Sequence, residues 1–186
     1  GIMSALTLQP ATSDDMARVF RWANDPATRA ASFNSAEIPW ADHQAWFTDA
    51  LQRHDRQLFI AMLPEPPSPT PTAASAATSA QIAAGLVRLQ VDPARPGFAE
   101  VGINVAPEAR GRGVGRQALV ALVSQARALG LVQLLASIRP SNPASIRAFE
   151  AVGYRRIADS EIDGQPALRF VLDLGGDATH PPAPER

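Results

Sequence analysis

The sequence contains neither cysteine nor lysine, since all 17 of its basic residues are arginine. The absence of cysteine excludes disulfides, a thiol nucleophile and thiolate metal ligands. The absence of lysine excludes both the phosphate-binding lysine of a Walker loop and a Schiff-base lysine. Only one tyrosine is present, Tyr154. These absences narrow the chemistry before any motif is considered.

The sequence also has few histidines and a small net charge. His43, His54 and His180 lie far apart, with no spacing typical of a metal site, so no metal is expected. The formal net charge of −1 gives no basic excess for nucleic-acid binding. Residues 118–136, the most apolar stretch, are interrupted by polar side chains, and no signal peptide is visible. We therefore expect a cytoplasmic protein with neither nucleic acid nor a membrane as partner.

The length of 186 residues and the apolar content of 46% suit a single domain. Gly1 and Ile2 precede Met3 and are interpreted as expression remnants, so the domain is expected over 3–174. Residues 64–80 are almost entirely Pro, Ala, Ser and Thr, which predicts a flexible loop inserted between two hairpin strands. The Gly- and Pro-rich residues 175–186 are expected to form a disordered tail.

Hydrophobic periodicity predicts the order strand, helices, three strands, helix, strand, helix, two strands. The expected strands are 6–10, 58–63, 81–91, 98–105, 132–138, 154–159 and 167–174. The expected helices are 12–22, a short piece from 26, 40–55 with an apolar stripe of Ala45, Trp46, Ala50 and Leu51, 113–129, and 142–153. Asp163-Gly164 predicts a hairpin with a longer than minimal loop. The fold class is α/β, a mixed sheet of six or seven strands flanked by helices.

The most informative segment is Val105–Gly115, where a strand enters a tight turn and then a long helix. Glycines at 111, 113 and 115 let the backbone approach a ligand closely. Free N–H groups and the helix dipole favour phosphate at such a helix start, and Arg110, Arg112 and Arg116 add positive charge. The segment predicts a diphosphate-containing ligand.

This interpretation has three alternatives, two nucleotide-binding motifs and a turn without a ligand. A P-loop needs Gly-Lys-Ser or Gly-Lys-Thr, which is absent. A dinucleotide fingerprint places its third glycine where Arg116 stands, and it follows a first strand rather than lying past mid-chain. The third alternative is a glycine-rich turn that merely opens an ordinary helix.

The run Arg110-Gly111-Arg112-Gly113-Val114-Gly115 resembles R/Q-x-x-G-x-G/A, the acetyl-CoA signature of GNAT acetyltransferases. Residues Asn142 to Tyr154 also resemble that family, with a small residue three after the Asn, an aromatic seven after it, and Gly-Tyr at the end. The resemblance extends over about 6–174. It implies the GNAT fold, with strands that splay apart at the acetyl-CoA site, and an N-acetyltransferase that uses acetyl-CoA.

The resemblance also implies which residues hold CoA. The backbone of Ile103 and Val105 would pair with pantetheine, and the turn would hold the pyrophosphate. The implied contacts are Arg110, Gly111, Arg112, Gly113, Val114, Gly115, Arg116, Asn142, Ser145 and Phe149. Asn142 is also suited to cap its helix. Phe149 departs from the family, because many GNAT enzymes carry there a tyrosine that is thought to protonate the leaving thiolate.

Glu100 and Asn104 are the catalytic candidates. By strand alternation they share one face with Gly102. In several GNAT branches a glutamate on this strand acts as base, often through water, and an attacking ammonium must lose a proton. The alternative for Glu100 is a surface carboxylate. Asn104 could orient substrate or water.

The N-terminal half resembles GNAT enzymes that acetylate nucleotide-linked amino sugars, such as those of the pseudaminic acid type, through W-x-N-D-P, S-x-N-S and H-x-x-W-F. The implied acceptor contacts are Trp22, Asn24, Arg29, Asn34 and His43. Core packing is the favoured alternative for Trp22, and a solvated helix start is an alternative for His43. Other acceptors remain open: a protein N-terminus, an aminoglycoside, a polyamine or an amino acid. A non-catalytic acyl-CoA sensor and a homodimer are further alternatives.

Overall fold

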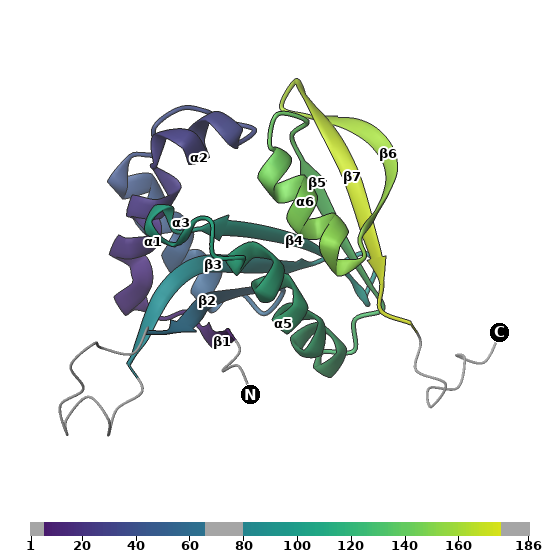
Figure 1. Ribbon diagram of the computed structural model, residues 1–186, viewed down its shortest axis with the longest axis horizontal. Coiled ribbons are helices and arrows are strands. Elements are labelled where there is room, and N and C mark those ends of the chain that lie inside the picture. Colours follow the sequence, from purple (N-terminus) through teal and green to yellow (C-terminus); the bar gives the residue numbers. More distant parts are fainter. Residues whose placement is uncertain (1–5, 66–79, 176–186) are drawn as a thin grey trace.

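The computed structural model describes residues 6–65 and 80–175. They form one mixed sheet of seven strands in the order β1-β2-β3-β4-β5-β7-β6 (Figure 1). The strands are β1 (Thr7–Pro10), β2 (Arg56–Pro64), β3 (Gln81–Val91), β4 (Phe98–Val105), β5 (Gln133–Ile138), β6 (Arg155–Ile162) and β7 (Gln165–Asp173). The helices are η1 (Ser13–Asp15), α1 (Met16–Ala23), α2 (Pro26–Ala31), α3 (Trp40–Gln52), η2 (Pro107–Ala109), α5 (Val114–Ala128) and α6 (Pro143–Val152). The flexible loop expected within 64–80 and the tail expected from 175 fall almost wholly outside the described residues.

Helices cover both faces of the sheet (Figure 1). α5 contacts β1, β3 and β4 and also packs against α6, while α1 contacts β3 and β4 and α3 contacts β2. The core between these layers includes Val19, Leu89, Leu119 and Leu134. The α/β class and the mixed sheet predicted from the sequence are confirmed.

Capping residues explain where several helices begin. Thr12 and Asp15 form a reciprocal capping box ahead of α1. Asn142 accepts a hydrogen bond from the backbone N–H of Ser145 at the start of α6, with Pro143 in the first turn, as the sequence predicted. These side chains satisfy N–H groups that a helix start leaves without internal partners.

The sheet opens between β4 and β5. β3 and β4 pair antiparallel from Gly85↔Val105 to Val91↔Ala99. β4 and β5, by contrast, are parallel and pair only over Phe98–Glu100. Beyond Glu100 the two strands separate, and this is the splay that the resemblance implied.

Two local predictions were wrong. Helix α3 ends at Gln52, because Arg53 adopts an extended conformation, and it buries His43, Phe47 and Ala50 while Ala45 is exposed. The β6–β7 hairpin has a minimal two-residue turn, since Ile162 pairs directly with Gln165. Both turn residues, Asp163 and Gly164, have positive φ, and this suits the twist of a tight hairpin.

Candidate functional site

The edge of β4 that faces the opening carries free backbone groups. The Ala106 N–H donates to the Ala84 carbonyl at 2.7 Å, and the Asp92 N–H donates to the Phe98 carbonyl at 2.9 Å. Hydrogen-bonding direction alternates along a strand, so the even-numbered residues of β4 bond to β3. The N–H and C=O groups of Ile103 and Val105 therefore point to the side from which β5 has departed. An extended chain can pair with them there.

The start of α5 lies directly beyond this edge. Gly111 and Gly113 have φ of +79° and +71°, a region that side chains disfavour, so the turn depends on glycine there. The first helical hydrogen bond runs from the Gln117 N–H to the Gly113 carbonyl at 3.1 Å. The preceding N–H groups, at residues 114–116, have no partner within the helix and favour an anion.

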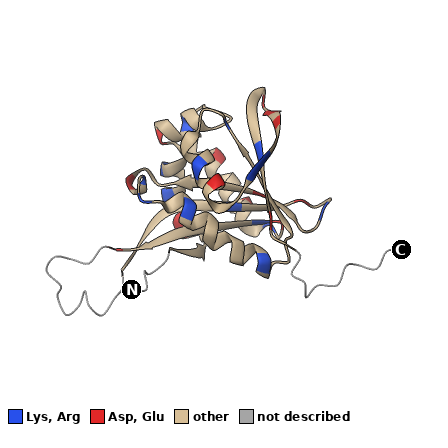
Figure 2. Ribbon diagram, turned by 45° about the vertical axis from the view of Figure 1, so that its right-hand side comes forward, with Lys and Arg blue, Asp and Glu red and all other residues tan. Residues whose placement is uncertain are grey.

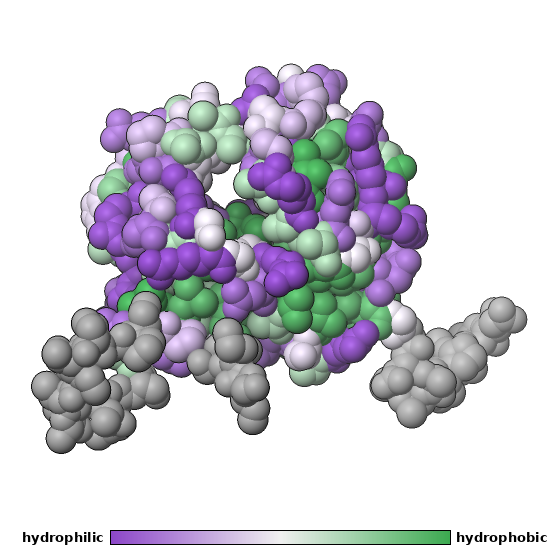
Figure 3. Space-filling model, viewed as in Figure 1, coloured by the Kyte–Doolittle hydropathy of each residue, from purple (hydrophilic) through white to green (hydrophobic). Residues whose placement is uncertain are grey.

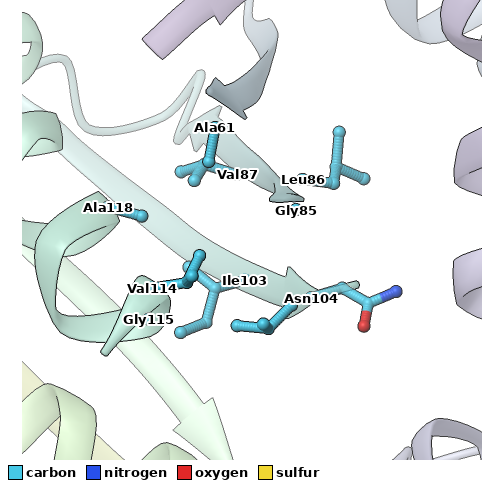
Figure 4. Close-up of a pocket in the computed structure, with 10 residues that line it drawn as sticks. Ala61, Gly85, Leu86, Val87, Ile103, Asn104, Val114, Gly115 and Ala118 are labelled. Carbon is cyan, nitrogen blue, oxygen red and sulfur yellow. The ribbon is translucent and has the colours of Figure 1, made fainter. Parts of the chain in front are cut away.

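Gly115 lets α5 approach the sheet and α6 closely. A Cβ at this position would lie 3.4 Å from both Ile103 Cδ1 and Ala148 Cβ. Figure 4 shows the Ile103 side chain near Val114 and Gly115, while the amide of Asn104 points away from them. The surrounding seam encloses no water-sized space, so it is packing rather than a ligand pocket.

The three arginines of the turn have different surroundings. Arg110 lies 2.5 Å from the Asp25 carboxylate and 3.1 Å from the Thr28 hydroxyl. The hydrogen bond from Arg110 lowers the pKa of Asp25. Arg112 and Arg116 are exposed, and neither forms an ion pair within the described part of the chain. The side chain of Arg110 is thus turned towards α2.

An open groove of about 600 Å³ lies beside this ion pair. It is lined by Phe20, Arg21, Asn24, Asp25, Pro26, Glu37, Pro107 and Glu108. Arg21 and Glu108 are both largely exposed and stand 3.4 Å apart. The groove is a solvated surface of mixed charge rather than an enclosed pocket.

At the start of α6, Asn142 and Ser145 are half-buried. Asn142 caps the helix, and none of the hydrogen bonds within the described residues uses its Nδ2. Phe149 differs from the prediction of a CoA contact, because it is only 2% exposed. Its ring packs edge-on against Tyr154 with centroids 4.8 Å apart. Phe149 therefore belongs to the core beneath α6.

Glu100, Gly102 and Asn104 share the face of β4 opposite Ile103. Arg169 on β7 donates to Glu100 Oε1 at 2.7 Å and also contacts the Ser137 hydroxyl on β5. Since Glu100 is the last β4 residue paired with β5, this ion pair stands where the two strands separate.

Two of the predicted acceptor contacts lie in the core. Trp22 is 1% exposed and His43 is 3% exposed. His43 Nε2 lies 2.9 Å from the Met16 carbonyl, which can only accept, so the ring donates. Burial lowers the pKa of His43. Both side chains pack the α1–α3 layer, and neither can touch a substrate. Trp22 therefore has the alternative role that the sequence analysis gave it, core packing. His43 is buried, so it is not a solvated helix start.

Asn24 and Arg29 hold the loop after α2. Asn24 bonds both backbone groups of Ile38, and Arg29 donates to the carbonyls of Ala23 and Asn34. Asn34 is exposed, and its Oδ1 accepts from the N–H of Ala36. Asn24 and Arg29 thus have structural roles, and no described residue bonds the amide nitrogen of Asn34.

Sequence reasoning missed three arginines, namely Arg88, Arg139 and Arg169. Arg88 and Arg169 lie within strands, whereas Arg139 directly follows the end of β5. The partners of all three side chains become known only from the folded structure. Arg139 donates to the carbonyls of Ala30 and Ser32 at 2.8 and 2.9 Å, so it ties the end of α2 to the end of β5. Figure 3 shows the molecule hollowed between α2 and α6, above β4.

Charges are mixed over the ribbons (Figure 2). Within residues 6–65 and 80–175, no group of three or more His, Asp or Glu side chains could hold a metal ion. No helix in the same residues is long and apolar enough to cross a membrane.

A parallel strand pair that opens beside a glycine-rich helix start, with free backbone groups on both, defines a CoA-dependent acyltransferase. The chain belongs to the acetyltransferase (GNAT) domain family, whose model matches residues 5–155. Acetyl-CoA is therefore its acyl donor, and the two elements that would hold it, the β4 edge and the α5 start, fit an extended thioester arm followed by a diphosphate.

Solved structures share this fold. The chain is 20% identical to AAC(6')-Ib in complex with ribostamycin and coenzyme A, with a TM-score of 0.73 over 91% of this chain and 94% of that one. It is 18% identical to spermidine N-acetyltransferase from Vibrio cholerae in complex with CoA and spermine, with a TM-score of 0.73 over 92% and 96%. It is 22% identical to a putative phosphinothricin N-acetyltransferase, with a TM-score of 0.69 over 92% and 100%. No curated protein sequence matches the chain.

Proposed function

We propose that this protein transfers the acetyl group of acetyl-CoA directly to the primary amine of an amino sugar, free or nucleotide-linked. The observation that carries the proposal is the position of Glu100 and Asn104. They lie on the same strand whose open edge at Ile103 and Val105 can pair with the thioester arm. Donor and acceptor can then meet at one strand from different sides.

On the donor side, pantetheine pairs with the backbone of Ile103 and Val105. The diphosphate binds the free N–H groups at the start of α5, with Arg112 and Arg116 supplying positive charge. The unused amide nitrogen of Asn142 and the nearby Ser145 hydroxyl contact the CoA arm. Arg110 acts differently, because it holds α2 against this turn through Asp25.

On the acceptor side, Glu100 removes a proton from the ammonium group through a water molecule. Its Oε1 is held by Arg169, and no described residue bonds its Oε2. Asn104 orients the amine or that water. The amine nitrogen then forms a bond to the acetyl carbon and loses its second proton to solvent while the carbon–sulfur bond breaks. General base catalysis of this kind contributes roughly 10²–10⁴ in rate.

The departing thiolate takes its proton from solvent. Phe149 has no proton to donate and is buried. Tyr154 is 3% exposed and follows the C-terminal end of α6, and burial raises its pKa. Neither ring serves as general acid, and a CoA thiolate is a tolerable leaving group without one.

The acceptor class is supported by the resemblance of the N-terminal half to amino-sugar acetyltransferases. It is also supported by the exposed side chain of Asn34, which follows α2. AAC(6')-Ib, which shares the fold, is described with ribostamycin, and the Vibrio cholerae enzyme is described with spermine. Aminoglycosides, polyamines and protein N-termini are therefore the competing acceptors. Their charges and sizes differ enough for a kinetic panel to separate them.

The test is a thiol-release assay with acetyl-CoA and a panel of amines. Because the chain has no cysteine, the protein itself contributes no thiol background. Turnover with amino sugars or their nucleotide-linked forms is expected. Turnover confined to polyamines or peptides would move the acceptor to another class. Tight CoA binding with no turnover on any amine would favour the acyl-CoA sensor.

A further inference from the structure

The guanidinium of Arg88 lies against Gly102. These residues are direct cross-strand partners on β3 and β4. A Cβ built at Gly102 would stand 2.8 Å from Arg88 Nη2 and 3.2 Å from Cζ, closer than packed atoms allow. A larger residue at this position would displace the guanidinium. Glycine at 102 thus creates the space that this arginine occupies.

Arg88 forms no direct ion pair within the described residues, although the charge of Glu100 acts on it and raises its pKa. Glu100 is instead paired with Arg169. Arg56 on β2 is the cross-strand partner of Gln90, two residues along β3 from Arg88. It donates to the Gln90 side chain at 2.5 Å and adds a second cation. The protein atoms around Arg88 lower its pKa overall, yet its side chain remains open to solvent.

The position of this cation relates it to the reaction. Gly102 stands on β4 midway between Glu100 and Asn104, about 7 Å from each along the strand at the usual rise. All three share one face, so a group bound at Arg88 lies beside both proposed catalytic side chains. An acceptor that reaches them must also pass or contact the guanidinium.

We propose that Arg88, which lies against Gly102, binds an anionic group of the acceptor, a carboxylate or a phosphate, and so selects amines that also carry a negative charge. This inference rests on the proposed acetyltransferase function and adds a charge requirement to it. A guanidinium matches both anions, because its N–H groups bind two oxygens side by side. Polyamines and aminoglycosides are polycations, and the Arg88 and Arg56 charges oppose their binding.

The test compares amines that differ only in the anion. Glucosamine and glucosamine 6-phosphate form the phosphate arm, and phenylalaninamide and phenylalanine form the carboxylate arm. Thiol release at saturating acetyl-CoA gives kcat/KM for each. In at least one arm, the anionic member is expected to react at least 10-fold faster. Arg88→Gln should reduce that rate roughly 10- to 100-fold, mainly through KM, and leave the neutral member within about twofold.

Two further variants separate charge recognition from folding. Gly102→Ala keeps the arginine but displaces it, at little cost because the clash is with a flexible side-chain end. It should reproduce the loss seen with Arg88→Gln. Arg95→Gln, in the exposed β3–β4 turn, is the matched control and should change neither arm. CoA affinity, measured by calorimetry, should be equal in all four proteins.

Equal rates for both members of both pairs, or equal losses on both in Arg88→Gln, would overturn the charge requirement while CoA binding still upheld the acetyltransferase. A wild-type protein that binds no CoA would contradict the proposed function itself, and this inference with it.

Discussion

Arg169 donates to Oε1 of Glu100 across 2.7 Å and joins β7 to β4 beside the point where β4 and β5 separate. The side chain of Arg169 is three-quarters buried and that of Glu100 about half. This contact fixes one carboxylate oxygen and leaves the other for water. It also binds the two halves of the sheet where backbone pairing ends.

Glu100→Gln should lower kcat/KM for the preferred amine by about 100-fold, because the amide fills the same space but cannot accept the proton. CoA affinity should stay unchanged. Thiol release and CoA calorimetry measure the two quantities. Glu150→Gln, an exposed carboxylate on α6, is the control. An undiminished rate in Glu100→Gln would remove Glu100 from the mechanism.

Gly111→Ala should weaken CoA binding by 10-fold or more, because the residue has φ of +79° and the turn must rearrange to accept a side chain. Gly130→Ala offers a matched control. It has φ of +77° at the other end of α5, and neither glycine has an atom within 4 Å of the added Cβ. Both variants should lose about 1–3 kcal/mol of stability. Equal CoA affinities in the two variants would show that the turn does not hold CoA.

Arg110→Gln should raise KM for the amine and leave CoA affinity nearly unchanged, because Arg110 bonds Asp25 and Thr28 at the start of α2. Asp25 also caps that helix by accepting from the Thr28 N–H, so Asp25→Ala should cost about 0.5–2 kcal/mol. Arg21→Gln removes an exposed ion pair and should change neither the KM for the amine nor the stability. If Arg110→Gln instead lost CoA affinity and kept the same KM for the amine, Arg110 would belong to the diphosphate site.

His43 should make the protein less stable in mild acid. Burial lowers the pKa of His43 in the folded state, so the unfolded chain binds its proton more readily. The stabilising contribution is complete above the unfolded pKa of about 6.5 and is lost as pH falls towards the folded value. Thermal melts between pH 8 and 5 should show this decline. His43→Gln should flatten it, and His54→Gln, at an exposed position, should not. Parallel profiles for all three proteins would exclude His43 as the cause.

The strands and the glycine turn were predicted from the sequence better than the surroundings of individual side chains, for physical reasons. Strands at 81–91 and 98–105 follow from alternation and bounding turns, and the Gly111–Gly115 turn follows from local backbone demands. Asn24 and Arg29 could not be assigned, because their partners are backbone groups of a loop whose path depends on tertiary contacts. Arg88 could not be found, because its meaning depends on a glycine 14 positions away that only the strand register brings opposite it.

The opening between β4 and β5 means that a bound acyl donor should stabilise the folded state. Among residues 6–65 and 80–175, only Phe98 to Glu100 of β4 pair with β5 and so connect the two half-sheets there. A bound pantetheine arm would supply part of the missing ladder, as an added strand does. Ligand at 100 times its dissociation constant stabilises a folded protein by about 2.7 kcal/mol. The lifetime of this protein against unfolding and proteolysis should accordingly follow the acetyl-CoA concentration of its surroundings, so that the enzyme persists where its donor is plentiful.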